Sequence, residues 1–255
     1  MMQVEIVRDP ETLARAGAEH FVALATAAIA ARGRFAVALS GGETPRGTHA
    51  ELARPPFLDQ VDWPRVHVFW GDERCVPPDH PDSNYRMTRE TLLDRVPLPA
   101  ANIHRIRGES EPRQAAAQYE QELRAFFSDS GERALTTDAG EPPRFDLILL
   151  GLGEDGHTAS LFPGTPALRE RRRWVMAQHI DKLDARRITL TLPVINAAAD
   201  VIFLVSGPKK AETLRRVLAD PAPADADQLP ARLVVPAAGR VVWLVDTDAA
   251  GLLRD

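Results

Sequence analysis

Short apolar runs recur along the whole chain, and they constrain its fold more than any other feature. They occupy residues 4–7, 35–40, 66–70, 145–151, 188–192, 201–206 and 241–246. Several are apolar on both faces, as central strands of a covered parallel sheet are. Helical patterns lie between them, at residues 11–32, 84–95, 112–128 and 208–219. The alternation predicts an α/β three-layer sandwich, a mostly parallel, Rossmann-like sheet with helices on both faces.

Length and composition favour a single domain. The chain has 255 residues, of which 44% are hydrophobic and 26% charged, as in ordinary globular proteins. Residues 129–143 and 220–230 have the polar, proline-containing composition of solvated loops. Neither is long or biased enough for a domain linker. We therefore expect one domain over residues 1–255.

Charge and cysteine content argue against several kinds of partner. The net charge is -5 and no basic block is present, which argues against nucleic-acid binding. No stretch approaches the length of a membrane-spanning helix, and the N-terminus does not resemble a secretory signal. Cys75 is the only cysteine, so no intramolecular disulfide or cysteine-based zinc site can form. We expect a cytoplasmic protein, and a monomer because no long apolar surface stripe is evident.

A glycine pair follows the run that ends at Ser40. Gly41 and Gly42 come next, and Pro45 suits the first turn of a helix. Glycines let backbone N–H groups turn toward an anion, and a helix N-terminus adds a favourable dipole. The segment therefore suggests a phosphate-binding loop. It lacks the G-K-[ST] ending of a nucleotide-binding loop, and a plain strand-to-helix turn is an equally good interpretation.

Charged residues directly follow the predicted strand at residues 66–70. Asp72, Glu73 and Arg74 could combine general-base chemistry with anion capture; a solvated charged turn is the alternative. The same loop contains three potential metal ligands, Asp79, His80 and Asp82. Because prolines separate them, we expect an extended surface loop and no metal site.

Residues 151–156, "GLGEDG", match the G-x-G-x-x-G dinucleotide fingerprint. That fingerprint requires a long helix after the third glycine and an acidic residue about 20 positions later. Here Pro163 and Gly164 interrupt any helix within two turns, and residues 174–178 contain no acid. We therefore expect neither NAD nor another dinucleotide to bind.

His157 follows the same glycine-rich turn, beyond the end of a predicted strand. We expect it at the start of a short helix, whose dipole would disfavour the imidazolium form. Asp155 could accept the other ring N–H and select the tautomer. A lone histidine is usually structural, but this setting makes His157 the candidate general base.

Cations cluster around two later strands. Arg186 and Arg187 precede the run at 188–192, and Lys209 and Lys210 begin the helical pattern at 208–219. Lysines at a helix N-terminus oppose the helix dipole, so a local stabilising role explains them poorly. Arginine and lysine directed at one phosphate explain them better, although two solvated lysines on a turn remain an alternative.

These four segments together resemble the 6-phosphogluconolactonase family. The matching stretches are "LSGGETPRG", "GDERCVPPDHPDSNYRM", "FDLILLGLGEDGHTASLFPG" and "RRITLTLPVINAAADVIFLVSGPKKAETL", spread from residue 39 to about residue 214. The resemblance implies hydrolysis of 6-phosphogluconolactone, a small phosphosugar lactone, in the oxidative pentose phosphate pathway. It implies no metal and no cofactor.

Two rival functions share this likeness. The related glucosamine-6-phosphate deaminases carry tyrosine after the paired acids and an acidic segment after the histidine, whereas this chain has Arg74 and "SLFPG". Sugar-phosphate-sensing domains of transcription regulators have a similar fold. A regulator would need a basic DNA-binding segment ahead of the glycine loop, and the residues before Gly41 are not basic. The lactonase interpretation is therefore preferred.

The resemblance also implies roles for individual residues. His157 would act as the base, Asp155 would orient it, and Asp72 would position water or sugar hydroxyls. The phosphate would be held by Ser40, Gly41, Gly42, Thr44, Arg74, Arg187 and Lys210. We choose Lys210 over Lys209 because the family has a Lys-Ala pair at this point.

Two nearby residues are considered separately. Glu43 stands where the family commonly has serine; its carboxylate would repel a phosphate, so we expect it to point outward. Ser160 could be imagined as an esterase nucleophile close to His157. It does not lie in a G-x-S-x-G elbow, so we expect attack by water instead.

Overall fold

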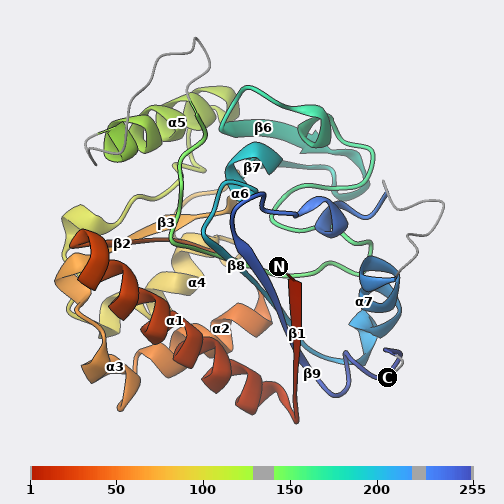
Figure 1. The fold of residues 1–255 in the computed structure, drawn as a ribbon. Helices are drawn as coiled ribbons and strands as arrows, with labels where there is room; N and C mark the ends of the chain where they lie inside the picture. The colour runs from red at the N-terminus through yellow and green to blue at the C-terminus, as the bar shows by residue number, and fades with distance from the viewer. Residues whose placement is uncertain (1, 129–140, 220–227, 254–255) are drawn as a thin grey trace.

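The computed structural model describes residues 2–128, 141–219 and 228–253, which form two sheets with helices around them (Figure 1). The main sheet is parallel between all neighbouring strands. Its strand order is β1 (Met2–Val7), β9 (Arg240–Asp246), β8 (Asp200–Val205), β5 (Leu147–Leu150), β2 (Phe35–Leu39) and β3 (Val66–Trp70). The predicted α/β fold with a mostly parallel sheet is confirmed.

The second sheet is smaller and antiparallel. It consists of β4 (Asp72–Arg74), β7 (Ala185–Leu190) and β6 (Val175–Ile180). The strand predicted at residues 188–192 is therefore β7, and it does not belong to the parallel sheet. β4 and β6 were not predicted from the sequence.

The predicted helices are present, with small differences at their ends. Helix 84–95 is shorter and ends in a separate 3₁₀ turn, and helix 208–219 begins with one. Most of the two predicted loops lies outside the described residues. The helices are α1 (Pro10–Arg32), α2 (Glu43–Leu52), α3 (Phe57–Gln60), α4 (Asn84–Thr91), α5 (Pro112–Ser128), α6 (Leu192–Ile195) and α7 (Ala211–Leu218). None in the described part of the chain is long and apolar enough to cross a membrane.

Helix α1 begins and ends where the sequence predicts. The Asp9 carboxylate accepts a hydrogen bond from the Thr12 backbone N–H, and Pro10 takes the first helical position. At the other end Gly33 adopts a φ of 75° and donates its N–H to the Ile29 carbonyl. Helix α1 packs against α2 and β9, so its buried stripe covers one face of the main sheet.

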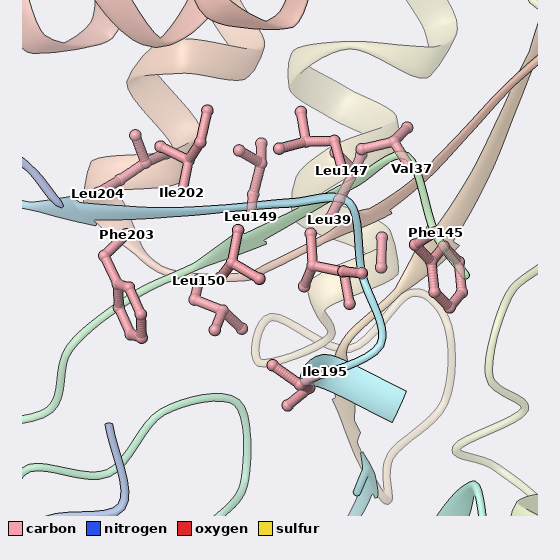
Figure 2. Packing of buried hydrophobic residues seen from close by; sticks show 14 of the residues in the cluster. Val37, Leu39, Phe145, Leu147, Leu149, Leu150, Ile195, Ile202, Phe203 and Leu204 are labelled. Carbon is pink, nitrogen blue, oxygen red and sulfur yellow. The ribbon is translucent and has the colours of Figure 1, made fainter. Parts of the chain in front are cut away.

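The central strands β2, β5 and β8 are buried on both faces. Figure 2 shows Ile202 and Leu204 directed to one side of β8 and Phe203 to the other. Phe203 stacks on Trp243 of β9, with ring centroids 3.8 Å apart. Helices α1 and α2 lie on one side of the main sheet, and the second sheet lies with α5 on the other (Figure 1). The second covering layer is thus part helix and part antiparallel sheet.

His49 of α2 makes stability depend on pH. Its imidazole is fully buried, and this burial lowers its pKa to about 4, whereas an unperturbed histidine has a pKa of about 6.5. Between these values the unfolded chain binds a proton that the folded protein does not. The contribution of His49 to the free energy of unfolding is therefore largest above pH 6.5, and it falls by about 1.4 kcal/mol per unit as the pH drops toward 4.

Urea unfolding at pH 7 and pH 5 checks this expectation. We expect the natural protein to lose about 2 kcal/mol more stability than a His49→Leu variant between these two values. His67, whose pKa burial also lowers to about 4, is present in both proteins and cancels in the comparison. A stability difference between the two proteins that does not change with pH would contradict the assignment.

Candidate active site

A cavity of about 410 Å³ opens beyond the carboxyl ends of four neighbouring strands, β8, β5, β2 and β3. Strand order reverses between β2 and β5, which is where ligands bind in open α/β sheets. The wall of the cavity contains most of the predicted site residues, namely Ser40, Gly41, Gly42, Thr44, Asp72, Arg74, His157 and Lys210. Asp155 and Arg187 lie outside the wall. The cavity wall thus contains residues from each of the four segments that the sequence analysis singled out.

The glycine loop after β2 presents a helix start to the cavity. Gly42 has a φ of 105°, a conformation that glycine adopts readily, and no side chain caps α2. The N–H groups of the first turn are therefore available to an anion. The Ser40 hydroxyl is buried in the same wall and has no partner among the described residues. Glu43 belongs to the cavity wall, but 90% of its side chain is exposed and its carboxylate pairs with Arg46.

Asp72 is buried in the cavity wall and is held by two side chains. Its Oδ2 accepts a hydrogen bond from Ser160 Oγ at 2.5 Å, and its Oδ1 accepts one from Asn84 Nδ2 at 3.2 Å. Ser160 therefore donates a hydrogen bond to Asp72 and does not line the cavity, which argues against its use as a nucleophile. A Cβ atom at Gly41 would lie 1.8 Å from Asn84 Oδ1, so Asn84 joins the glycine loop to Asp72. Sequence reasoning missed Asn84, whose only signal was its place at the start of a predicted helix.

Glu73 has a structural position and does not line the cavity. Its buried carboxylate accepts hydrogen bonds from the backbone N–H groups of Asn84 and Tyr85 at 2.8 Å, and from Ser83 Oγ at 3.1 Å. It also accepts one from the Arg74 N–H at 2.8 Å. Burial raises the pKa of Glu73 although these hydrogen bonds oppose the shift. Glu73 thus anchors the start of α4.

His157 lies in a tight turn. The expectation of a helix beginning at His157 is wrong, because the next helical element is the 3₁₀ turn at Pro166–Arg169. The Gly153 N–H donates to the His157 carbonyl at 2.8 Å, and the His157 N–H donates to Asp155 Oδ1 at 3.1 Å. The loop is therefore closed by its own backbone and by Asp155, and not by a helical turn.

The imidazole of His157 is held on both sides. Its Nδ1 lies 2.5 Å from Asp155 Oδ1, and its ring stacks on Phe162 with centroids 4.1 Å apart. A Cβ at Gly153 would lie 2.0 Å from Nδ1, so only glycine leaves room for the ring. A hydrogen on Nδ1 pointing at the carboxylate leaves Nε2 able to accept a proton.

Asp155 is itself held by two partners. Its second oxygen, Oδ2, forms an ion pair with Lys182 Nζ. Burial raises the pKa of Asp155, but the hydrogen bonds from His157 and Lys182 outweigh it and hold that pKa well below its usual range. Asp155 therefore stays ionised. The sequence analysis gave no role to Phe162, although Phe162 belongs to the "SLFPG" stretch after the histidine, and it missed Lys182, which lies in a separate hairpin.

The predicted arginines lie together, but only one reaches the cavity. Arg74 lines it and donates to the Asp82 carbonyl. Arg187 faces Arg74 across the β4–β7 pair and is half-buried; burial and the charge of Arg74 lower its pKa. Among the described residues, including the loop at 79–82, no group of three or more His, Cys, Asp and Glu side chains is placed to hold a metal ion.

Lys210 lines the cavity and Lys209 does not. Lys210 ends the 3₁₀ turn Pro208–Lys210, which leads into α7. Asp246 at the end of β9 fixes the preceding segment, since it accepts hydrogen bonds from Ser206 Oγ at 2.5 Å and from the Gly207 N–H at 3.0 Å. Asp246 was not predicted, although an acid at the end of a buried strand was its signal.

Comparison with known proteins agrees with this architecture. The family described as "Glucosamine-6-phosphate isomerases/6-phosphogluconolactonase" matches residues 8–243. The 6-phosphogluconolactonase of Synechocystis sp. is 47% identical over 90% of this chain and 89% of its own length. That of Nostoc sp. is 42% identical over 98% of both. The solved 6-phosphogluconolactonase of Trypanosoma brucei superposes with a TM-score of 0.82 at 30% identity, over 100% of this chain and 99% of that one. This chain therefore belongs to the glucosamine-6-phosphate isomerase/6-phosphogluconolactonase family.

Proposed function

We propose that the protein hydrolyses 6-phospho-D-glucono-1,5-lactone to 6-phosphogluconate, with His157 as the general base. The observation that carries the proposal is the Asp155–His157 pair, whose imidazole lines the same cavity as the glycine loop and Lys210. The cavity wall thus combines a group suited to act as a base with groups suited to bind an anion. The relatives named 6-phosphogluconolactonase, which match nearly the whole chain, support a lactone hydrolase.

In the proposed reaction, Nε2 of His157 takes a proton from a water molecule as the water oxygen bonds to C1 of the lactone. The carbonyl oxygen gains the negative charge of the tetrahedral intermediate, which backbone N–H groups of the glycine-rich turns are suited to stabilise. The bond between C1 and the ring oxygen then breaks, and His157 returns the proton to that oxygen. Asp155 keeps the imidazole in the required tautomer.

Asp72 fits a positioning role better than that of a second base. Both of its carboxylate oxygens already accept hydrogen bonds, from Asn84 and from Ser160. A carboxylate held in this way is fixed in direction and can still orient a sugar hydroxyl or the attacking water through its remaining lone pairs. We therefore propose that Asp72 aligns the substrate.

The phosphate would bind at the start of α2. The proposed contacts are the backbone N–H groups of residues 40–44, Arg74 and Lys210, with Arg187 beside Arg74 as a further positive charge. Holding the phosphate places C1 near His157 and supplies binding energy for orientation. We further propose that the enzyme works as a monomer in the cytoplasm, without a nucleic-acid or membrane partner.

Replacing Lys210 with alanine should raise KM about 10–100-fold, because a charged hydrogen bond to the phosphate is lost. Lys209→Ala is the matched control, since Lys209 adjoins Lys210 but does not line the cavity, and its KM should stay close to that of the natural protein. Steady-state kinetics on both variants measure the difference. Equal effects of the two substitutions would remove Lys210 from the phosphate site.

The activity is tested with 6-phosphogluconolactone generated in the assay, with the spontaneous hydrolysis rate subtracted. A rate above this background that scales with enzyme concentration supports the proposal. With no excess rate the proposal fails. The deaminase alternative is then tested by ammonia release from glucosamine 6-phosphate.

A further inference from the structure

Lys182 reaches the candidate base from a different part of the fold. It lies in the turn Asp181–Leu183 between β6 and β7, at the tip of a hairpin of the second sheet. Asp155 and His157 belong to the loop after β5 of the main sheet. The only other lysines of the chain are Lys209 and Lys210, so this hairpin places one of three lysines against the Asp–His pair.

Two contacts connect Lys182 to the imidazole. Its Nζ pairs with Asp155 Oδ2, while Asp155 Oδ1 contacts His157 Nδ1. Nζ also lies 5.5 Å from the centroid of the Phe162 ring, which stacks on His157. Lys182 is not part of the cavity wall. It therefore acts on the reaction without touching a ligand in the cavity, through its contacts with Asp155 and Phe162 and through its charge.

We propose that Lys182 is a positioning residue of the active site, which holds Asp155 in place and limits how strongly that carboxylate favours the imidazolium form of His157. The inference rests on the proposed role of His157 as base. A carboxylate fixed at one oxygen can rotate about its Cβ–Cγ bond, whereas donors from two separate segments fix both oxygens. The positive charge of Lys182 opposes the attraction of Asp155 for a protonated ring, so removing that charge strengthens this attraction.

The other charged groups near the ring do not change when Lys182 is replaced. Within the described residues, those that share the cavity wall with His157 are Glu43, Asp72, Arg74 and Lys210, from α2, β4 and the turn before α7. The charge of each of these groups is the same in the natural protein and in a variant at position 182. A difference between the pH profiles of two variants therefore reports the charge at position 182.

A comparison of Lys182→Met and Lys182→Arg tests the proposal. Methionine keeps much of the apolar stem and removes the charge, so the acid limb of the kcat/KM profile should move to higher pH by about 0.5–1 unit. The effect is modest because 55% of the Lys182 side chain is exposed. Arginine keeps the charge and should restore the natural profile. Leu183→Ala, an exposed neighbour in the same turn, is the control and should leave the profile unchanged.

Two results would overturn the proposal. One is a Lys182→Met profile that superimposes on the natural one. The other is a loss of activity that is equal at every pH, which a purely structural role would produce. An NMR titration of the His157 ring in the natural protein and in Lys182→Met provides a second measurement that needs no turnover. Its midpoint should rise in the variant, and an unchanged midpoint rejects the proposal even if lactone hydrolysis is absent, a result that bears on the proposed function separately.

Discussion

Replacing His157 with alanine should lower kcat/KM for lactone hydrolysis by about 10²–10⁴-fold, the contribution expected of a positioned general base. The substitution removes Nε2 while leaving the binding contacts of the cavity in place. The fold should persist, because 31% of the His157 side chain is exposed and its turn is closed by the backbone hydrogen bond from Gly153. Lactone hydrolysis above the spontaneous rate, measured on protein with an unchanged circular dichroism spectrum, gives the result.

His20→Ala is the control for this measurement. His20 lies on α1 and also contacts a carboxylate, Glu5 of β1, at 2.8 Å. It is outside the cavity wall, so its removal should leave kcat/KM unchanged. If the folded His157→Ala variant keeps full activity, the reaction can stand but the base must be another group.

Of the substitutions discussed for this protein, replacing Glu73 with alanine should lower stability the most, by about 3–5 kcal/mol in the free energy of unfolding. Glu73 accepts hydrogen bonds from three backbone N–H groups and from the Ser83 hydroxyl. Its removal leaves these donors without a partner where water has little access. Because they include the first residues of α4, Asn84 would shift as well, and Asp72 would lose one of its two hydrogen-bond donors.

Urea unfolding with matched controls measures this loss. Glu90→Ala removes an exposed carboxylate from the same helix, where Glu90 pairs with Arg86, and the change in stability should be small. Glu73→Gln keeps the size and one acceptor oxygen and should fall between the natural protein and Glu73→Ala. If Glu73→Ala is no less stable than Glu90→Ala, Glu73 does not anchor α4.

The main sheet and the location of the cavity are predictable from the sequence for a simple reason. Central strands such as β2, β5 and β8 are buried on both faces, so their apolar runs are continuous and easy to recognise. Parallel strands end at one edge, so the polar residues that follow them must meet there. That argument places Ser40, Asp72 and His157 in one site before any coordinates are known.

The features that the sequence does not reveal depend on contacts between distant segments. β4 is a short polar strand that exists only through pairing with β7. Asn84 and Lys182 act on the site through side-chain contacts over long sequence separations, with Asp72 and Asp155 respectively. The helix predicted at His157 is absent because the loop is closed by a Gly153–His157 hydrogen bond and a Thr158–Leu161 bridge. No local sequence pattern indicates these contacts.

The close packing of Gly41 against Asn84 limits which single substitutions the site can accept. Asn84 contacts the proposed phosphate loop through Gly41 and donates a hydrogen bond to Asp72, so the positions of the loop and of Asp72 depend on the same side chain. A side chain added at position 41 would displace Asn84 and disturb both together. A single substitution at position 41 is therefore expected to lower activity by disturbing both the glycine loop and Asp72, unless the side chain at position 84 becomes smaller at the same time.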